Sequence, residues 1–225
     1  MLGQAIGGLL PSAIGVALSP VPIVAVILVL GTPKARSNGP AFALGWVGGL
    51  VVVSVVVLVV ASGASNPDSA SSTALSAIKL ALGAVFLFMA AAQWQKRPKK
   101  GEKPVMPKWM ESIGTFTPAK SLAFGAALSG ANPKNLALTI AAAGSIAQAG
   151  LGAGQSTIAV AVFVVLGSLT VAGPVVFYML ATSAAERPLA AINDFMSDHN
   201  AVIMFVVLLV LGAKLLGDGI AGLSN

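Results

Sequence analysis

Six long apolar runs constrain the fold of this chain more than any other feature of its sequence. They cover residues 2–31, 41–61, 74–93, 122–149, 158–181 and 201–223. Each reaches the length of about 20 residues that an α-helix needs to cross the hydrocarbon core of a bilayer. Only 9% of the 225 residues are charged, against about 25% in soluble domains. We therefore predict an all-α integral membrane protein with six transmembrane helices in a single domain over residues 1–225.

The connections between these runs differ in their charge. The first, third (residues 96–117) and fifth connections hold nine Lys and Arg residues, whereas the second and fourth hold none. Basic connections stay in the cytoplasm, so we expect residues 96–117 inside and both termini outside. This distribution accounts for the excess of 13 Lys+Arg over 7 Asp+Glu without a nucleic-acid partner. The first thirty residues carry no Lys or Arg, unlike a signal peptide, and are expected to remain as a helix.

The sequence repeats itself weakly at an offset of 110 residues. The matching pairs are Ala13 with Ala123, Gly15 with Gly125, Ala17 with Ala127, Leu18 with Leu128 and Ser19 with Ser129. Because each half has three spans, the second copy must be inverted relative to the first. The pattern predicts a 3+3 inverted-topology repeat, with repeats over 1–95 and 118–225 joined by the basic loop 96–117. The alternative is a chance match between Ala- and Gly-rich helices.

Prolines follow the repeated segment in both copies. Pro20 and Pro22 come directly after Ser19, and Pro133 comes after Asn132 with a shift of one residue. Ser and Asn are good N-caps, and proline suits the first position of a helix because its missing N–H would have no partner there. We therefore predict that helices one and four are broken, and that each restarts inside the membrane.

A helix that begins inside a membrane presents unpaired N–H groups and a partial positive charge, which favour an anion. Lys134 adds a full charge about 18 Å into the fourth run, where a lysine is functional by default. The candidate substrate-binding residues are Ser19, Pro20, Pro22, Ser129, Asn132, Pro133, Lys134 and Asn135. The alternative is that Lys134 only bonds to carbonyls that Pro133 leaves free.

Other charged residues give weaker signals. Asp194, Asp198 and His199 cluster at the cytoplasmic mouth of the sixth run and are weak candidates for proton coupling, or simply a solvated loop. Snorkelling accounts for Lys79 and Lys214 near the outer ends of their runs. The sequence has no cysteine, no His-x-x-x-His motif and no Ser-centred glycine elbow. We therefore expect neither an enzyme, a cofactor nor a metal site.

Three segments resemble one known family. LGTPKARSNG at 30–39, running into AFALGW at 41–46, resembles the first connection and second helix of the Sap/GAP family. These are the sulfolipid- or peptidoglycolipid-addressing proteins of mycobacteria and their relatives, within the LysE superfamily of exporters. SGANPKNL at 129–136 resembles the family's Asn-Pro-Lys-Asn segment, and FVVL at 163–166 with Gly173 and Pro174 resembles its fifth helix.

The resemblance covers nearly the whole chain and implies a 3+3 fold in the bacterial inner membrane. It further implies export of a lipid-linked component of the cell envelope, with membrane lipids, further copies of the chain or a larger lipid-export machinery as partners. The first expectation is a transporter that moves an anionic, lipid-linked molecule by alternating access. An exporter of small amino acids or ions, and an accessory scaffold for a larger lipid exporter, are the alternatives.

Overall fold

The computed structural model of the chain describes residues 1–63, 70–95, 97 and 109–223. Every regular element in these ranges is a helix, so the prediction of an all-α chain is confirmed for them. The helices are α1 (Leu2–Ala17), α2 (Pro20–Leu30), α3 (Ala35–Gly63), α4 (Ala70–Gln95), α5 (Trp109–Ser112), the 3-10 turn η1 (Ile113–Thr115), α6 (Pro118–Gly130), α7 (Pro133–Gln148), α8 (Ala153–Leu180) and α9 (Thr182–Leu223). Most of the basic loop, residues 96 and 98–108, lies outside the described residues.

Four of these helices contain a segment long and apolar enough to cross a membrane. These segments are Ala35–Val60, Ser76–Gln95, Ala153–Leu180 and Thr182–Leu223. Helices α1 and α2 pass the same test as a pair bent by 51°. The described residues thus give four to five candidate spans, which fits a multi-pass membrane protein. The count of six spans and the 3+3 inverted repeat stay predictions.

The predicted breaks in the first and fourth apolar runs are confirmed. Ser19 is the extended residue before α2, and Asn132 is the extended residue before α7. Pro20 and Pro133 each occupy the first helical position, where the fixed φ of proline is suitable and its missing N–H is not needed. Pro20 and Pro133 therefore hold corresponding positions at the two helix restarts.

The last helix is longer than its apolar run. We expected a loop before residue 201, but α9 is continuous for 42 residues from Thr182. Ala185 and Leu189, one turn apart, are buried, and α9 packs against α2. A buried stripe at this spacing stabilises a helix even where the other residues are polar. Asp194, Asp198 and His199 consequently lie on a helix, and the expectation of a loop there was wrong.

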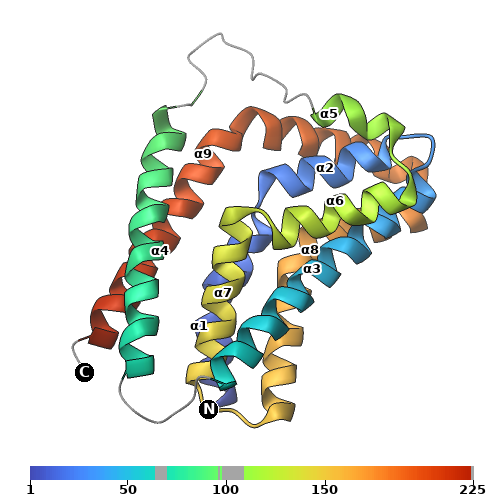
Figure 1. Ribbon diagram of the computed structural model, residues 1–225. Helices are drawn as coiled ribbons and strands as arrows, with labels where there is room; N and C mark the ends of the chain where they lie inside the picture. The colour runs from blue at the N-terminus through green and yellow to red at the C-terminus, as the bar shows by residue number, and fades with distance from the viewer. Residues whose placement is uncertain (64–69, 96, 98–108, 224–225) are drawn as a thin grey trace.

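The two breaks bring four half-length helices together. Figure 1 shows α1 and α7 side by side below the breaks, and α2 and α6 running from the breaks toward the opposite end. Helix α3 packs along α6, and α4 packs along α9 on the other flank. The start of α1, the end of α9 and the α7–α8 connection lie at one end of the molecule, and the α2–α3 and α8–α9 connections lie at the other.

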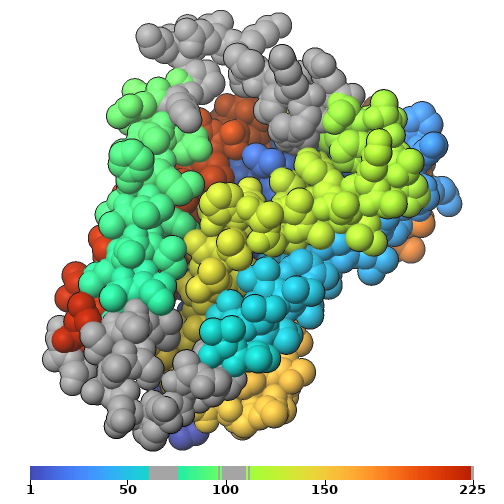
Figure 2. All heavy atoms as spheres, viewed as in Figure 1, coloured from blue at the N-terminus to red at the C-terminus, as the bar shows by residue number. Residues whose placement is uncertain are grey.

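Glycines let the helices on both flanks approach closely. A Cβ added at Gly45 of α3 would overlap the backbone of Leu122 in α6, and one added at Gly125 of α6 would overlap the carbonyl oxygen of Phe42. In the α4–α9 pair, a Cβ added at Gly212 would come within 3.1 Å of a backbone oxygen of α4. Close backbone approach through small residues is typical of membrane helix pairs. On the face shown in Figure 2, α7 is visible between these flanks, with α4 on one side and α3 on the other.

Candidate functional site

The two helix breaks meet at Lys134, the second residue of α7. Its side chain is buried, with 3% of its surface exposed. The Nζ atom donates one hydrogen bond to the carbonyl oxygen of Gly15 at 2.8 Å and one to the Oγ of Ser19 at 2.6 Å. Both acceptors belong to the other break, more than a hundred residues away in the sequence. Lys134 therefore connects the two halves of the chain at the point where each half loses its helical backbone.

A hydrogen-bond chain continues from Lys134 through two further side chains. The Oγ of Ser19 donates to the Oδ1 of Asn135 at 2.9 Å, and the Nδ2 of Asn135 donates to the carbonyl oxygen of Leu128 at 2.9 Å. Ser19 and Asn135 are both buried. Each member of such a chain polarises the next, and the low dielectric of the interior makes loss of any one member expensive. The network thus favours one relative position of the two breaks.

The carbonyls at the end of α1 are available because the helix stops. The last carbonyls of a helix have no partner within it, and Pro20 brings no N–H to the following turn. Lys134 bonds the carbonyl of Gly15, and the Oγ1 of Thr170 in α8 donates to the carbonyl of Ala17 at 2.6 Å. Side chains from two other helices therefore replace the missing helical hydrogen bonds.

Gly15 also has too little space for a side chain. A Cβ added there would lie 2.5 Å from a methyl carbon of Leu211 and 2.9 Å from one of Leu138. Both distances are too short for real Cβ contacts, so a neighbour would have to shift. The two leucines therefore pack directly over the residue whose carbonyl holds Lys134.

The two residues before the helix restarts have different tasks. Asn132 caps α7, because its Oδ1 accepts a hydrogen bond from the backbone N–H of Lys134 at 3.1 Å. This confirms the sequence prediction of an N-cap. Ser19 occupies the N-cap position of α2, but its side chain makes no capping hydrogen bond. Its hydroxyl is already engaged by Lys134 and Asn135, so the cap expected from Ser19 is absent.

The structure brings four of the predicted substrate-binding residues together, namely Ser19, Asn132, Lys134 and Asn135. Pro20 and Pro133 begin the two helices beside them, and Pro22 is buried within α2. The hydroxyl of Ser129 does not bond to this group but is engaged within its own helix. Ser129 is buried against Gly49 of α3, and its Oγ donates to the carbonyl of Ala126 at 3.1 Å.

The weak coupling candidates lie on the first half of α9. Asp194 lines a cavity of ≈ 360 Å³ between α2 and α9, together with Tyr178, Glu186 and Asn193. Asp198 is exposed, while the Nδ1 of His199 lies 2.9 Å from the carbonyl oxygen of Phe195. Among the residues that the structure describes, no three His, Cys, Asp or Glu side chains are placed to hold a metal ion.

Sequence reasoning missed Gly15 and Thr170, which both take part in hydrogen bonds at the end of α1. Gly15 acts through its backbone carbonyl. Every residue has such a carbonyl, so the residue type could not indicate this role. Thr170 had a weak signal, since it is one of few polar residues in the apolar run 158–181. Lys134 itself forms no ion pair in the described part of the chain. A buried basic group without a carboxylate partner favours a ligand that supplies the negative charge.

One comparison with known proteins gives a match. The model of a family described as SfLAP: Sap, sulfolipid-1-addressing protein, matches residues 9–221, nearly the whole chain. The matched range includes both helix breaks, Lys134 and Thr170. No curated protein and no solved structure gives a significant match.

Proposed function

Because this chain belongs to the Sap, sulfolipid-1-addressing protein, family, we propose that it is a transporter that exports an anionic, lipid-linked component of the cell envelope. The family suggests a lipid-related role in the envelope, and the apolar helices fit a membrane protein. The observation that carries the transport proposal is the contact of the buried Lys134 with Gly15 and Ser19 across the two breaks. We expect no enzymatic activity.

The substrate's anionic group would compete for the Nζ atom of Lys134. A carbonyl and a hydroxyl oxygen accept hydrogen bonds from this nitrogen in the structure. Phosphate or sulfate oxygens carry charge and form stronger hydrogen bonds with a basic group than neutral oxygens do. Replacing Ser19 and Gly15 by such a group would release the α1–α2 break from α7. Binding at the centre would thereby loosen the contact that holds the two halves together.

Alternating access follows if the two halves are inverted copies that rock against each other. Some of the helix contacts support this arrangement, because they occur in matching pairs. Helix α1 packs on α8, and its counterpart α6 packs on α3. In the same way α2 contacts α8, and its counterpart α7 contacts α3. Reciprocal contacts of this kind are expected between two halves that are related by a two-fold axis.

The proposed location is the bacterial inner membrane, with residues 96–117 in the cytoplasm and both termini outside. The charge of the connections supports this orientation. Other copies of the chain or a larger lipid-export machinery are the proposed partners. The LysE superfamily, to which the sequence segments point, contains exporters and therefore favours movement out of the cytoplasm.

Reconstitution of the purified full chain in liposomes tests the proposal. A fluorescent lipid with a phosphate monoester headgroup is the probe, and a fluorescent phosphatidylcholine is the control lipid. We expect the chain alone to accelerate movement of the anionic probe between the leaflets and to leave the control lipid unaffected. Uptake of amino acids or ions without lipid movement would favour the small-solute exporter. Inactivity of well-folded protein toward every probe would favour the scaffold and overturn the proposal.

A further inference from the structure

One face of α7 connects the central lysine with a second polar cluster. Lys134, Leu138, Ala141, Ser145 and Gln148 follow each other at alternating steps of four and three residues. This spacing places all five side chains in one stripe along the helix. Lys134 lies at the start of the stripe, and Gln148 lies about 20 Å away at its other end, at 1.5 Å per residue.

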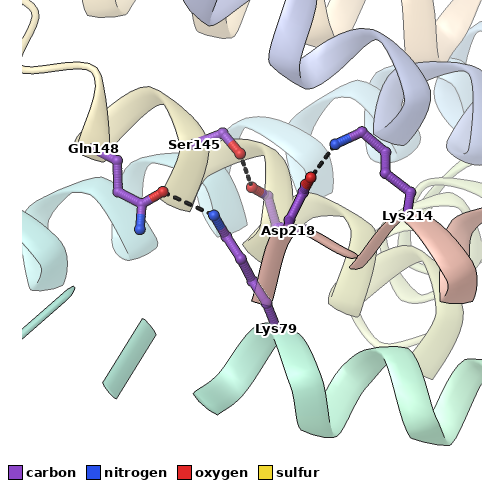
Figure 3. Close-up of polar contacts among 6 residues, drawn as sticks. Lys79, Ser145, Gln148, Lys214 and Asp218 are labelled. Atoms are coloured by element: carbon purple, nitrogen blue, oxygen red, sulfur yellow. Dashed lines mark hydrogen bonds and ion pairs between the residues drawn. The ribbon is translucent and has the colours of Figure 1, made fainter. Parts of the chain in front are cut away.

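Basic side chains from two other helices gather at the far end of this stripe. The Nζ of Lys79 in α4 donates to the Oε1 of Gln148 at 2.8 Å. In α9, the Nζ of Lys214 lies 2.5 Å from the Oδ2 of Asp218. Figure 3 shows Lys79 extending from α4 toward α7, with Asp218 beside it and Lys214 beyond. The cluster therefore gathers side chains from the three helices α4, α7 and α9.

The cluster has an unbalanced charge. Lys79 is within electrostatic range of both Lys214 and Asp218, and one carboxylate cannot neutralise two lysines. Gln148 supplies a neutral oxygen only. Snorkelling of Lys79 toward water, the expectation from the sequence, is compatible with its hydrogen bond to Gln148, which is exposed and reaches a different helix. The side chains of Lys214 and Asp218 are 35% and 38% exposed, so a ligand can reach them.

Two leucines separate this cluster from the central site. Leu138 belongs to the same stripe of α7, and Leu211 lies one turn before Lys214 in α9. Both pack over Gly15, whose carbonyl accepts from Lys134. The order along the stripe is thus a buried lysine, an apolar contact and a half-exposed basic cluster. This order is suited to a ligand that rests at two places and passes a barrier between them.

We propose that Lys79 and Lys214, held by Gln148 and Asp218, form a second binding site for a phosphate or sulfate group at the outer end of α7. An oxygen of the ligand would take the place of the Gln148 Oε1 on Lys79, and a second oxygen would approach Lys214. The inference rests on the proposed function in one respect, namely that the cargo is anionic. It adds a site that the cargo occupies after it has left Lys134.

Native mass spectrometry of the full chain in detergent tests this site. The probe is dioleoyl phosphatidic acid, and phosphatidylcholine with the same acyl chains is the reference lipid. We expect Lys79→Gln to weaken phosphatidic acid binding about tenfold, as loss of a charged hydrogen bond would. Asp218→Asn removes the only carboxylate of the cluster and should strengthen binding several-fold. Lys120→Gln, at an exposed lysine on α6, should leave binding unchanged.

The opposite signs distinguish a ligand site from a structural role. If the cluster only stabilises the helices, both variants will weaken binding through misfolding or neither will change it, and either result would overturn the proposal. Equal affinity of the wild-type chain for the two lipids would also overturn it. Competition with inorganic phosphate separates the two sources of the same chemistry. Displacement of the lipid by phosphate indicates a site for the anion alone, and persistence of the lipid indicates a headgroup site that also uses the acyl chains.

A second readout keeps this inference distinct from the proposed function. Lys134→Met leaves the outer cluster intact, so we expect it to bind phosphatidic acid at this site as the wild type does. If Lys134→Met transports normally while Lys79→Gln loses binding, the central site fails and the outer site holds. If Lys134→Met abolishes transport while Lys79→Gln and Asp218→Asn change nothing, the proposed function holds and the outer site is wrong.

Discussion

At the scale of single residues, Lys134 carries the transport hypothesis. Lys134→Met keeps the length and the apolar stem of the side chain but removes its charge. We expect normal insertion and folding, because methionine is cheaper than lysine inside a membrane. Transport of the anionic probe in liposomes should fall to background. Lys134→Arg should retain partial activity at most, since a planar guanidinium does not fit the space of a compact ammonium. Normal transport by both variants would mean that Lys134 only donates hydrogen bonds to carbonyls that lack a helical partner.

Thr170 offers a separate test of the packing around the break. Thr170→Val keeps the shape of the side chain but leaves the carbonyl of Ala17 without its donor. We expect the free energy of unfolding to fall by about 1–3 kcal/mol, the cost of a buried polar group without a partner. Unfolding by denaturant in detergent would measure this loss. Thr157→Val is the matched control, because the Oγ1 of Thr157 is exposed and bonds only to Ala153 in its own helix. Equal losses in both variants would contradict this assignment.

Lys134, Asn132 and the two breaks could be predicted because each has a local signature. A lysine inside an apolar run and proline after Ser or Asn are visible in the sequence itself. The acceptors of Lys134 were not visible in this way. One is a backbone carbonyl, and the other is a serine that sequence reasoning assigned to a helix cap. Which donor meets which acceptor depends on how α1 packs against α7, and no local pattern records this contact.

At the scale of helices, close approach through glycine should dominate stability. Gly45→Val would force a side chain into the backbone of Leu122 in α6. We expect a loss of about 1–3 kcal/mol or more, as for other overpacked positions, seen as a lower thermal midpoint and as aggregation in detergent. Gly48→Val, on the same helix with nothing within 4 Å of its added Cβ, should be tolerated. A normal thermal midpoint for Gly45→Val would contradict the observed packing of α3 on α6.

The helix boundaries show where hydropathy stops being informative. Residues 182–200 contain four charged side chains, and by composition they resemble a loop. They are helical because Ala185 and Leu189 bury one narrow stripe, which a mean over the segment does not reveal. The α6–α7 break, by contrast, was found from Asn132 and Pro133 alone. Strong local signals fixed the breaks, whereas the extension of α9 depends on tertiary packing.

At the scale of the whole molecule, the orientation in the membrane can be tested with single cysteines, because the chain has none. We expect a cysteine at Ser71 to react with a membrane-impermeant reagent in intact cells. A cysteine at Lys103, in the basic loop, should react only after the membrane is opened, since basic connections remain in the cytoplasm. Labelling of intact cells, followed by a mass shift on a gel, measures both. The reverse pattern would invert the topology and the proposed direction of transport.

The global arrangement was the least accessible from the sequence. The weak repeat predicts two related halves, and this relation stays a prediction. Yet the sequence could not indicate that α4 and α9 would pair along one flank. Pairing of distant helices depends on glycines such as Gly83 and Gly212 meeting at one level. The alignment of two helices along their length is set when the bundle assembles. It cannot be read from the sequence of either helix alone.

The contact between Lys134 and Gly15 determines which substitutions the two positions can tolerate during evolution. The acceptor is a main-chain oxygen, so it is present whatever amino acid the codon at position 15 specifies. Mutation can damage this half of the site only through the volume of the new side chain, which would meet Leu138 and Leu211. At position 15, selection should therefore act on the size of the side chain and not on its polarity. At position 134, a single substitution that removes the charge would abolish the contact. Of the two positions in this contact, only position 134 therefore depends on the chemistry of its side chain.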